Sequence, residues 1–141
     1  MIIVSLLGLA DASYITYEKF SGVVPTCVLT GIFKCSTVLE SPWSSIGPIP
    51  LSLLGMGFYA TVFLLASYLL LKKDAPAKLS TFLFSLAIFG FGFSIYLTVI
   101  QAFIIKAFCF FCVLSAVSSS LLFAIAWIGH RQRLKAGRVE E

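Results

Sequence analysis

Four long apolar stretches dominate this chain of 141 residues and constrain its fold more than any other feature. They run over about residues 2–20, 51–71, 79–105 and 107–128. At 1.5 Å per residue, each would form a helix about 28 Å long or longer, which is enough to cross the hydrocarbon core of a bilayer. Backbone groups cannot stay unpaired in lipid, so spanning segments of this kind are helices. The sequence therefore predicts an all-α membrane protein built as a bundle of four transmembrane helices.

The composition excludes the soluble classes of protein. Hydrophobic residues make up 60% of the chain and charged residues 11%, whereas a soluble domain is roughly half apolar and a quarter charged. A chain of this size has too little interior to bury so much apolar surface away from water. The net charge of +4 is not gathered into a basic patch interleaved with aromatic residues, so we expect no nucleic-acid partner. The composition therefore indicates that the bilayer covers the apolar surface of the chain.

The segment between the first two stretches, residues 21–50, has a different character. It is rich in Pro, Gly, Ser and Thr, so we expect a long loop with at most a short helical piece near residues 43–46. The next connection, residues 72–78, is a short polar turn, and only Gln101 and Lys106 mark the turn before the fourth stretch. The chain is therefore expected to form one membrane domain with a single large connection.

Lys and Arg residues near the span ends predict the orientation of this domain. Seven lie on one side and three on the other: Lys72, Lys73, Lys78, Arg131, Arg133, Lys135 and Arg138 against Lys19, Lys34 and Lys106. The side with the larger number is expected to be cytoplasmic. Both termini then face the cytoplasm and the loop faces outward. We predict a membrane domain over residues 1–130, with its outward loop at 21–50, and a basic cytoplasmic tail over 131–141.

The first stretch also has features of a signal peptide. Residues 2–9 form a short apolar core, and residues 10–12 have the small-x-small pattern of a cleavage site. However, no basic residue precedes the core, and residues 13–17 continue the apolar segment. We therefore interpret this stretch as the first membrane span.

All four cysteines fall on the predicted outer side, where disulfides form and persist. Cys27 and Cys35 lie in the loop, and Cys109 and Cys112 lie at the outer end of the fourth span. The latter two form a C-x-x-C in the first turn of a helix, where residues three apart share a face within disulfide reach. Two dithiol pairs, one in a loop and one embedded, can form a relay for electrons.

Two opposing effects act on the thiol pKa at this C-x-x-C. The N-terminus of a helix favours a thiolate, the species that attacks disulfides, and so lowers the pKa. Phe108, Phe110 and Phe111 make the surroundings apolar, and desolvation of a thiolate raises the pKa. The sequence leaves this balance open.

Two interpretations without catalysis compete with a redox function. A Cys₄ zinc site would need a second pair of closely spaced cysteines, whereas Cys27 and Cys35 are eight residues apart, so we expect no metal site. The cysteines could instead form two inert structural disulfides on an extracytoplasmic face. Either interpretation describes a membrane subunit that is not an enzyme.

Three segments carry a resemblance to a known family. They are residues 8–18 in the first span, residues 35–59 with Cys35, Pro42, the Gly47–Leu51 run, Gly55 and Tyr59, and residues 106–115 around the C-x-x-C. Together they resemble the vitamin K epoxide reductase family, including its bacterial disulfide-forming members, over residues 8 to about 115. The other family of four-span disulfide-forming quinone reductases places its C-x-x-C in the first outward loop, whereas here the C-x-x-C lies on the fourth span.

This resemblance implies a four-helix bundle around a quinone pocket. Cys112 would be the sulfur that faces the quinone, and Cys109 would be its partner, which accepts electrons from Cys35. Cys27 would form the loop disulfide with Cys35 and meet an external thioredoxin-like protein. Electrons would pass from that protein through both cysteine pairs to a quinone of the ubiquinone, menaquinone or vitamin K type. The oxidised partner could then make disulfides in exported proteins.

The pocket residues follow from the resemblance and from the span positions; they are Cys112, Phe111, Asp11, Leu51, Gly55, Tyr59 and Ala116. Asp11 lies near the middle of the first span, where an ionisable group is costly and faces the bundle interior. Vertebrate members hydrogen-bond the vitamin K ring through an Asn and a Tyr, whereas Leu51 and Ala116 stand at the matching positions here. We therefore expect quinone binding through shape, aromatic contacts and Cys112, with an ER-type vitamin K quinone or epoxide reductase as the alternative.

Many bacterial members of this family carry a fused thioredoxin-like domain after the last span. Here the chain ends soon after residues 131–135, so the expected partner is a separate periplasmic or lumenal thioredoxin-like dithiol protein. The resemblance to bacterial members indicates a prokaryotic plasma membrane, with the cysteines on the extracytoplasmic side. The sequence thus predicts a multi-pass thiol–quinone oxidoreductase that supports disulfide formation.

Overall fold

The computed structural model describes residues 1–22, 34–72 and 74–139, and these are almost entirely helical. Four long helices and one π-helical segment make up most of the structure. They are α1 (Ile2–Ser21), α3 (Leu51–Leu71), α4 (Ala77–Val99), the π-helix η2 (Ile100–Ile105) and α5 (Phe110–Val139). The prediction of an all-helical membrane protein from the apolar stretches is confirmed to this extent.

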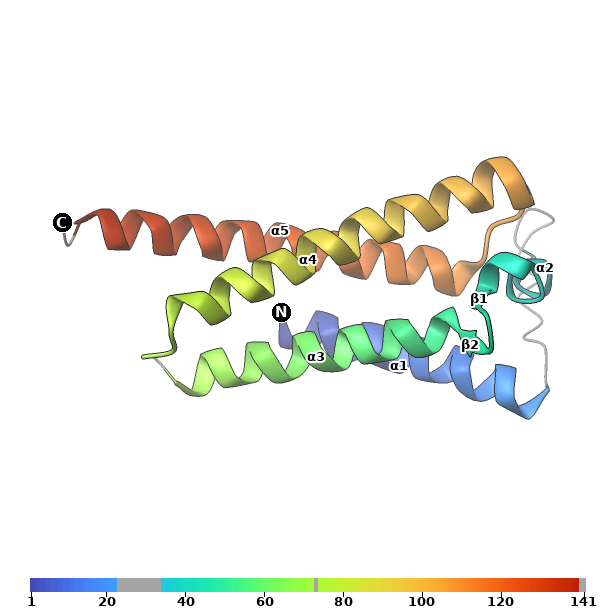
Figure 1. The fold of residues 1–141 in the computed structure, drawn as a ribbon, viewed down its shortest axis with the longest axis horizontal. Helices are drawn as coiled ribbons and strands as arrows, with labels where there is room; N and C mark the ends of the chain where they lie inside the picture. Colours follow the sequence, from blue (N-terminus) through green and yellow to red (C-terminus); the bar gives the residue numbers. More distant parts are fainter. Residues whose placement is uncertain (23–33, 73, 140–141) are drawn as a thin grey trace.

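The long helices lie alongside one another in an elongated bundle (Figure 1). α1 packs against α3 and α5, and α4 packs against α5 and α3. The α3–α4 turn and the C-terminus lie at one end of the bundle, whereas α2 (Cys35–Leu39), a small hairpin and the α4–α5 connection lie at the other end. The two segments that hold most of the basic residues are therefore brought to the end opposite the cysteines of α2 and α5.

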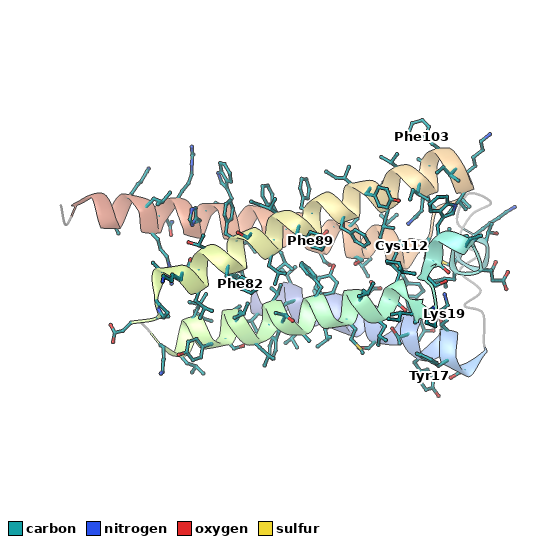
Figure 2. The ribbon with its side chains drawn as sticks, viewed as in Figure 1. Tyr17, Lys19, Phe82, Phe89, Phe103 and Cys112 are labelled. Atoms are coloured by element: carbon teal, nitrogen blue, oxygen red, sulfur yellow. The ribbon has the colours of Figure 1, made fainter. Side chains whose placement is uncertain are left out.

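Three helical segments of the described chain are long and apolar enough to cross a membrane, namely Leu51–Leu71, Ala77–Ile105 and Phe110–Ala136. Large apolar side chains project outward from them, as Phe103 does with 75% of its surface exposed (Figure 2). Helix α1 forms where the first span was predicted, but it carries Asp11, Glu18 and Lys19 and is not among these candidates. A fourth span, and with it the four-span topology, stays a prediction.

The helix boundaries differ from the predicted spans at the α4–α5 connection. The fourth span was predicted from residue 107, whereas α5 begins at Phe110. Lys106 adopts the left-handed conformation, with φ 54°, and ends η2, so the chain must turn before it can re-enter a helix. The predicted tail over residues 131–141 continues α5 as far as Val139, because the residues after Gly129 include good helix formers.

The connection between α1 and α3, as far as it is described, is more ordered than the predicted loop. A 3₁₀ turn (Pro42–Ser44) follows α2, and strand β1 (Ser45–Ile46) then pairs antiparallel with β2 (Ile49–Pro50). Gly47 has φ 62° and Pro48 follows it, which is the pattern of a type II′ hairpin turn. The helical piece predicted at residues 43–46 is therefore wrong in its second half, where a strand forms.

Aromatic rings join α4 to α5 in the half of the bundle away from α2. The ring centroids of Phe84 and His130 are 4.6 Å apart, and those of Phe91 and Phe123 are 4.9 Å apart, both pairs being nearly parallel. Phe84 also contacts Phe123 and Trp127. We call these five residues the aromatic ladder. Offset stacking of this kind contributes to helix packing beyond the area that it buries.

Candidate redox site

The candidate site begins with two buried cysteines that are far apart in the sequence. Cys35 is 1% exposed and Cys109 is 0% exposed. Their Sγ atoms lie 3.5 Å apart although 74 residues separate them along the chain. Val38 and Ala107 complete the buried cluster around the two sulfurs. The contact excludes water and brings the sulfurs within reach of bond formation.

Backbone and side-chain hydrogen bonds fasten α2 over the start of α5. The Lys34 N–H donates to the Phe108 carbonyl at 3.1 Å, which aligns the residues just before Cys35 and Cys109. On the other side, Lys19 Nζ donates to Ser44 Oγ at 2.9 Å, so the end of α1 is tied to the turn after α2. These contacts hold Cys35 against Cys109 from two directions.

The two cysteines of the C-x-x-C occupy different environments. The Cys109 carbonyl accepts the Val113 N–H at 3.0 Å, so Cys109 is the N-cap residue of α5 rather than part of its first turn. Cys112 lies in the first turn of the helix, is half-buried and lines a cavity. Figure 2 shows it near the end of the bundle that carries α2. One sulfur is thus sealed against Cys35, and the other opens onto an internal space.

The balance that the sequence left open is decided for Cys109. A hydrogen bond with Cys112 and burial raise the pKa of the Cys109 thiol above its ordinary value. The contact with Cys35 acts in the opposite direction but is a smaller effect. In the reduced form, Cys109 therefore keeps its proton at neutral pH despite its position at a helix N-terminus.

The cavity beside Cys112 has a volume of about 350 Å³ and lies between α1, α3, α4 and α5. It falls in the range of small-molecule sites, at its lower end. Its walls include the aromatic rings of Phe58, Phe89, Phe93 and Trp43. All seven residues predicted to form a quinone pocket lie along it: Cys112, Phe111, Asp11, Leu51, Gly55, Tyr59 and Ala116. Their binding to a quinone stays a prediction, but the structure brings them together.

Few polar groups enter this cavity. Asp11 is 7% exposed, and neither of its carboxylate oxygens has a hydrogen-bond partner among the residues that the structure describes. The Tyr59 hydroxyl lies 2.8 Å from both the Ser115 carbonyl, to which it donates, and Ser115 Oγ. Tyr59 is therefore already paired, whereas Asp11 faces the cavity with its hydrogen-bonding capacity unused.

One predicted site residue cannot be placed. Cys27 lies outside the described residues, so its predicted pairing with Cys35 stays a prediction. Within the described ranges, no three His, Cys, Asp or Glu residues come together as metal ligands.

Three residues at this site were not predicted from the sequence. Gln101 accepts a hydrogen bond from the Cys109 N–H, Lys19 ties α1 to the segment after α2, and Ser115 holds Tyr59. Gln101 was noted only as a marker of the turn. A polar side chain in an otherwise apolar stretch is itself a signal of a role inside the bundle, and that signal could have identified Gln101.

The fold and the site define a membrane protein with a buried thiol contact next to an apolar cavity. The sequence model of the "Vitamin K epoxide reductase family" matches residues 1–127, which is most of the chain. The protein therefore belongs to the vitamin K epoxide reductase family, as its motifs indicated, and this membership implies a membrane oxidoreductase. Members of this family typically use quinones. A comparison with curated proteins gives no match.

Proposed function

We propose that this protein is a thiol–quinone oxidoreductase that oxidises a dithiol protein and thereby supports disulfide formation. The observation that carries the proposal is the difference in surroundings between the two sulfurs of the C-x-x-C. Cys109 is sealed against Cys35, whereas Cys112 lines the cavity. A thiol relay between an outer electron donor and an internal acceptor needs one sulfur facing each way.

The exchange steps follow from this geometry. When Cys109 and Cys112 form a disulfide, a Cys35 thiolate attacks Cys109 Sγ, the Cys109–Cys112 bond breaks, and Cys112 leaves as a thiolate. Cys27 then attacks Cys35 in the mixed disulfide, which forms the Cys27–Cys35 disulfide and releases Cys109. Two electrons have then moved from the loop pair to the C-x-x-C pair, and no other reactant is consumed.

A thioredoxin-like dithiol protein is the proposed electron donor to the loop pair. Its two thiols would reduce the Cys27–Cys35 disulfide through a mixed disulfide, and the partner would leave with a disulfide of its own. A quinone in the cavity supplies the other half of the reaction by taking up two electrons and two protons from the reduced C-x-x-C pair.

The residues of the cavity fit such a ligand. A quinone ring is flat and largely apolar, and the walls present aromatic rings and aliphatic side chains, with Cys112 reaching the same space. Leu51 and Ala116 line the cavity without offering a side-chain hydrogen bond, so recognition of the ring must come from shape and from other polar groups. This favours quinone reduction over the alternative of vitamin K epoxide reduction.

Asp11 is the group that we assign to the polar end of the ligand. An ionised carboxylate without a partner in apolar surroundings is costly, so burial shifts Asp11 toward its acid form, which can donate its O–H. A quinone carbonyl is an acceptor without a donor of its own. Asp11 can therefore hold the ligand by a hydrogen bond and supply a proton as the ring is reduced.

The decisive experiment is quinone-dependent oxidation of dithiothreitol by the purified protein, followed through the quinone absorbance. Ubiquinone and menaquinone analogues and vitamin K epoxide serve as separate acceptors. We expect turnover with at least one quinone and none with the epoxide. No turnover with any quinone, or cysteines that stay reduced when quinone is added, would refute the proposal in favour of structural disulfides.

A further inference from the structure

Gln101 accepts three backbone hydrogen bonds in the connection that leads to Cys109. Its carbonyl accepts the N–H of Lys106 and, at 3.3 Å, the N–H of Ala107. Its side-chain Oε1 accepts the N–H of Cys109 at 3.2 Å. Gln101 is itself 5% exposed, and it lies in the π-helix η2, where the wider turn lets one residue reach so far along the chain.

The Cys109 N–H needs this partner. Because Cys109 is the N-cap of α5, its N–H points away from the helix and has no place in the intrahelical ladder. The residue is fully buried, and a buried N–H without an acceptor destabilises the conformation that buries it. An acceptor at this point therefore selects one backbone position for Cys109.

That backbone position is the one that places Cys109 Sγ 3.5 Å from Cys35 Sγ. The connection from Lys106 to Cys109 is short and non-helical, and Lys106 is held in the left-handed conformation. The other anchor in this connection is the bond from the Lys34 N–H to the Phe108 carbonyl, which comes from the side of α2. Gln101 holds the same few residues from the side of α4.

We propose that Gln101 is a positioning residue that holds Cys109 against Cys35 and so favours disulfide exchange between the two. The inference rests on the proposed relay, in which a Cys35–Cys109 disulfide is the intermediate. Gln101 takes no part in the chemistry of the sulfurs. Its contribution is to keep the Cys109 backbone where bond formation with Cys35 needs no rearrangement.

Three substitutions separate the hydrogen bond from the bulk of the side chain. Gln101→Met has a similar length but removes the acceptor. Gln101→Glu keeps an oxygen acceptor at the same reach and serves as the conservative rescue. Gln101→Asn keeps the amide but is one methylene shorter, so its oxygen falls short of the Cys109 N–H. Thr81→Val is the matched control, since it removes a side-chain bond to the Ala77 carbonyl on the same helix, far from the site.

The test is a redox equilibrium that needs no quinone. In a full-length Cys27→Ser, Cys112→Ser background, only Cys35 and Cys109 remain. Oxidation by glutathione disulfide forms the Cys35–Cys109 disulfide and two molecules of glutathione. The purified protein is equilibrated in glutathione buffers, quenched with acid and treated with a maleimide-polyethylene glycol, so that the oxidised fraction is read from the gel shift.

We expect Gln101→Met and Gln101→Asn to lower the equilibrium constant for the disulfide about tenfold, as the loss of one hydrogen bond predicts. Gln101→Glu and Thr81→Val should stay within about twofold of the background protein, because neither removes the acceptor. The Asn variant carries the test if the Met variant does not fold. An unchanged constant in the folded acceptor-free variants, or an equal loss in the Glu variant, overturns the inference. Because no quinone is present, this outcome is independent of whether the protein reduces one.

Discussion

The two ends of the α4–α5 pair are stabilised in different ways. At the end near α2, which we call the thiol end, Cys109 contacts Cys35 through sulfur and donates its N–H to Gln101. Cys112 and Gln101 line the neighbouring cavity. In the other half, the aromatic ladder fastens the same two helices by stacked rings. The ladder contains no group that can form or break a disulfide, whereas the thiol end contains three cysteines.

This difference indicates which substitutions should affect activity and which should affect stability. In the proposed relay, Cys109 pairs in turn with Cys112 and with Cys35 at the thiol end, whereas the packed rings of the ladder resist movement of the helices. We therefore expect the ladder to keep α4 and α5 together while disulfides are exchanged at the thiol end. Substitutions at the thiol end should alter turnover, and substitutions in the ladder should alter stability.

The largest expected effect comes from the sulfurs. Cys109→Ala and Cys112→Ala should reduce thiol-dependent quinone reduction to background with any donor, because the pair that meets the quinone is lost. Cys35→Ala and Cys27→Ala should stop turnover with a protein donor but spare dithiothreitol, which can reduce Cys109–Cys112 directly. Steady-state quinone absorbance assays with both donors make the comparison. Equal losses for all four variants with both donors would contradict the relay.

The next effect concerns Asp11 at the cavity. Asp11→Asn keeps a hydrogen-bond donor but cannot release a proton, so kcat for quinone reduction should fall about 100-fold while KM changes little. Helix α1 offers Ser13→Ala as a control, since the Ser13 hydroxyl only bonds the Leu9 carbonyl on its own helix at 2.6 Å. A normal kcat in Asp11→Asn would remove the carboxyl group from the reaction and leave it a packing role.

The two sulfurs of the C-x-x-C should also differ in their reactivity. Cys109 is 0% exposed and its pKa is raised, whereas Cys112 is half-buried and lines the cavity. N-ethylmaleimide should therefore modify Cys112 of the reduced protein at least about tenfold faster. Peptide mass spectrometry over a pH series measures this ratio. The rise of Cys109 reactivity should lie above the ordinary thiol pKa and should move to lower pH in Cys112→Ala, where the main cause of the raised pKa is removed. Faster modification of Cys109 than of Cys112 at pH 7 would contradict the burial and the raised pKa of Cys109.

A smaller effect is expected in the aromatic ladder. Phe123→Leu removes ring contacts with Phe84, Phe91 and Trp127 and should lower the free energy of unfolding by about 1–2 kcal/mol. Denaturation of the detergent-solubilised protein provides the measurement, with Phe82→Leu as a control because Phe82 is 54% exposed. The kcat for dithiothreitol oxidation should not change. A large fall in kcat with unchanged stability would break the distinction between the two ends.

The smallest effect concerns the left-handed residue at the thiol end. Lys106→Gly relieves the strain of φ 54° and should raise the free energy of unfolding by about 0.5–1 kcal/mol. Lys106→Ala removes the same charge but keeps the strain, so it should give no such gain. Both variants are measured by the same denaturation assay. A loss of stability in the Gly variant would indicate that the Lys106 side chain itself stabilises the turn.

Much of the site could be predicted from the sequence because its signals are local. The C-x-x-C, the apolar stretches and Asp11 inside one of them can each be recognised within a few residues. Two features could not be predicted: the regular structure within residues 34–50 and the start of α5 at Phe110. The first depends on bonds to distant segments, and the second depends on the left-handed turn at Lys106. The role of Gln101 escaped prediction for the same reason, since its partner N–H lies eight residues away in a non-helical turn.

The sequence by itself determined the long helices, the all-helical class and the family, because apolar stretches and short motifs are properties of neighbouring residues. The family resemblance implied that Cys109 accepts electrons from Cys35, but only the tertiary structure shows the contact between their sulfurs. Cys35 and Cys109 are 74 residues apart in sequence, and their contact depends on how α2 folds over the start of α5. The raised pKa of Cys109 has the same origin: burial and a neighbouring sulfur outweigh a helix terminus only when all of them are packed together.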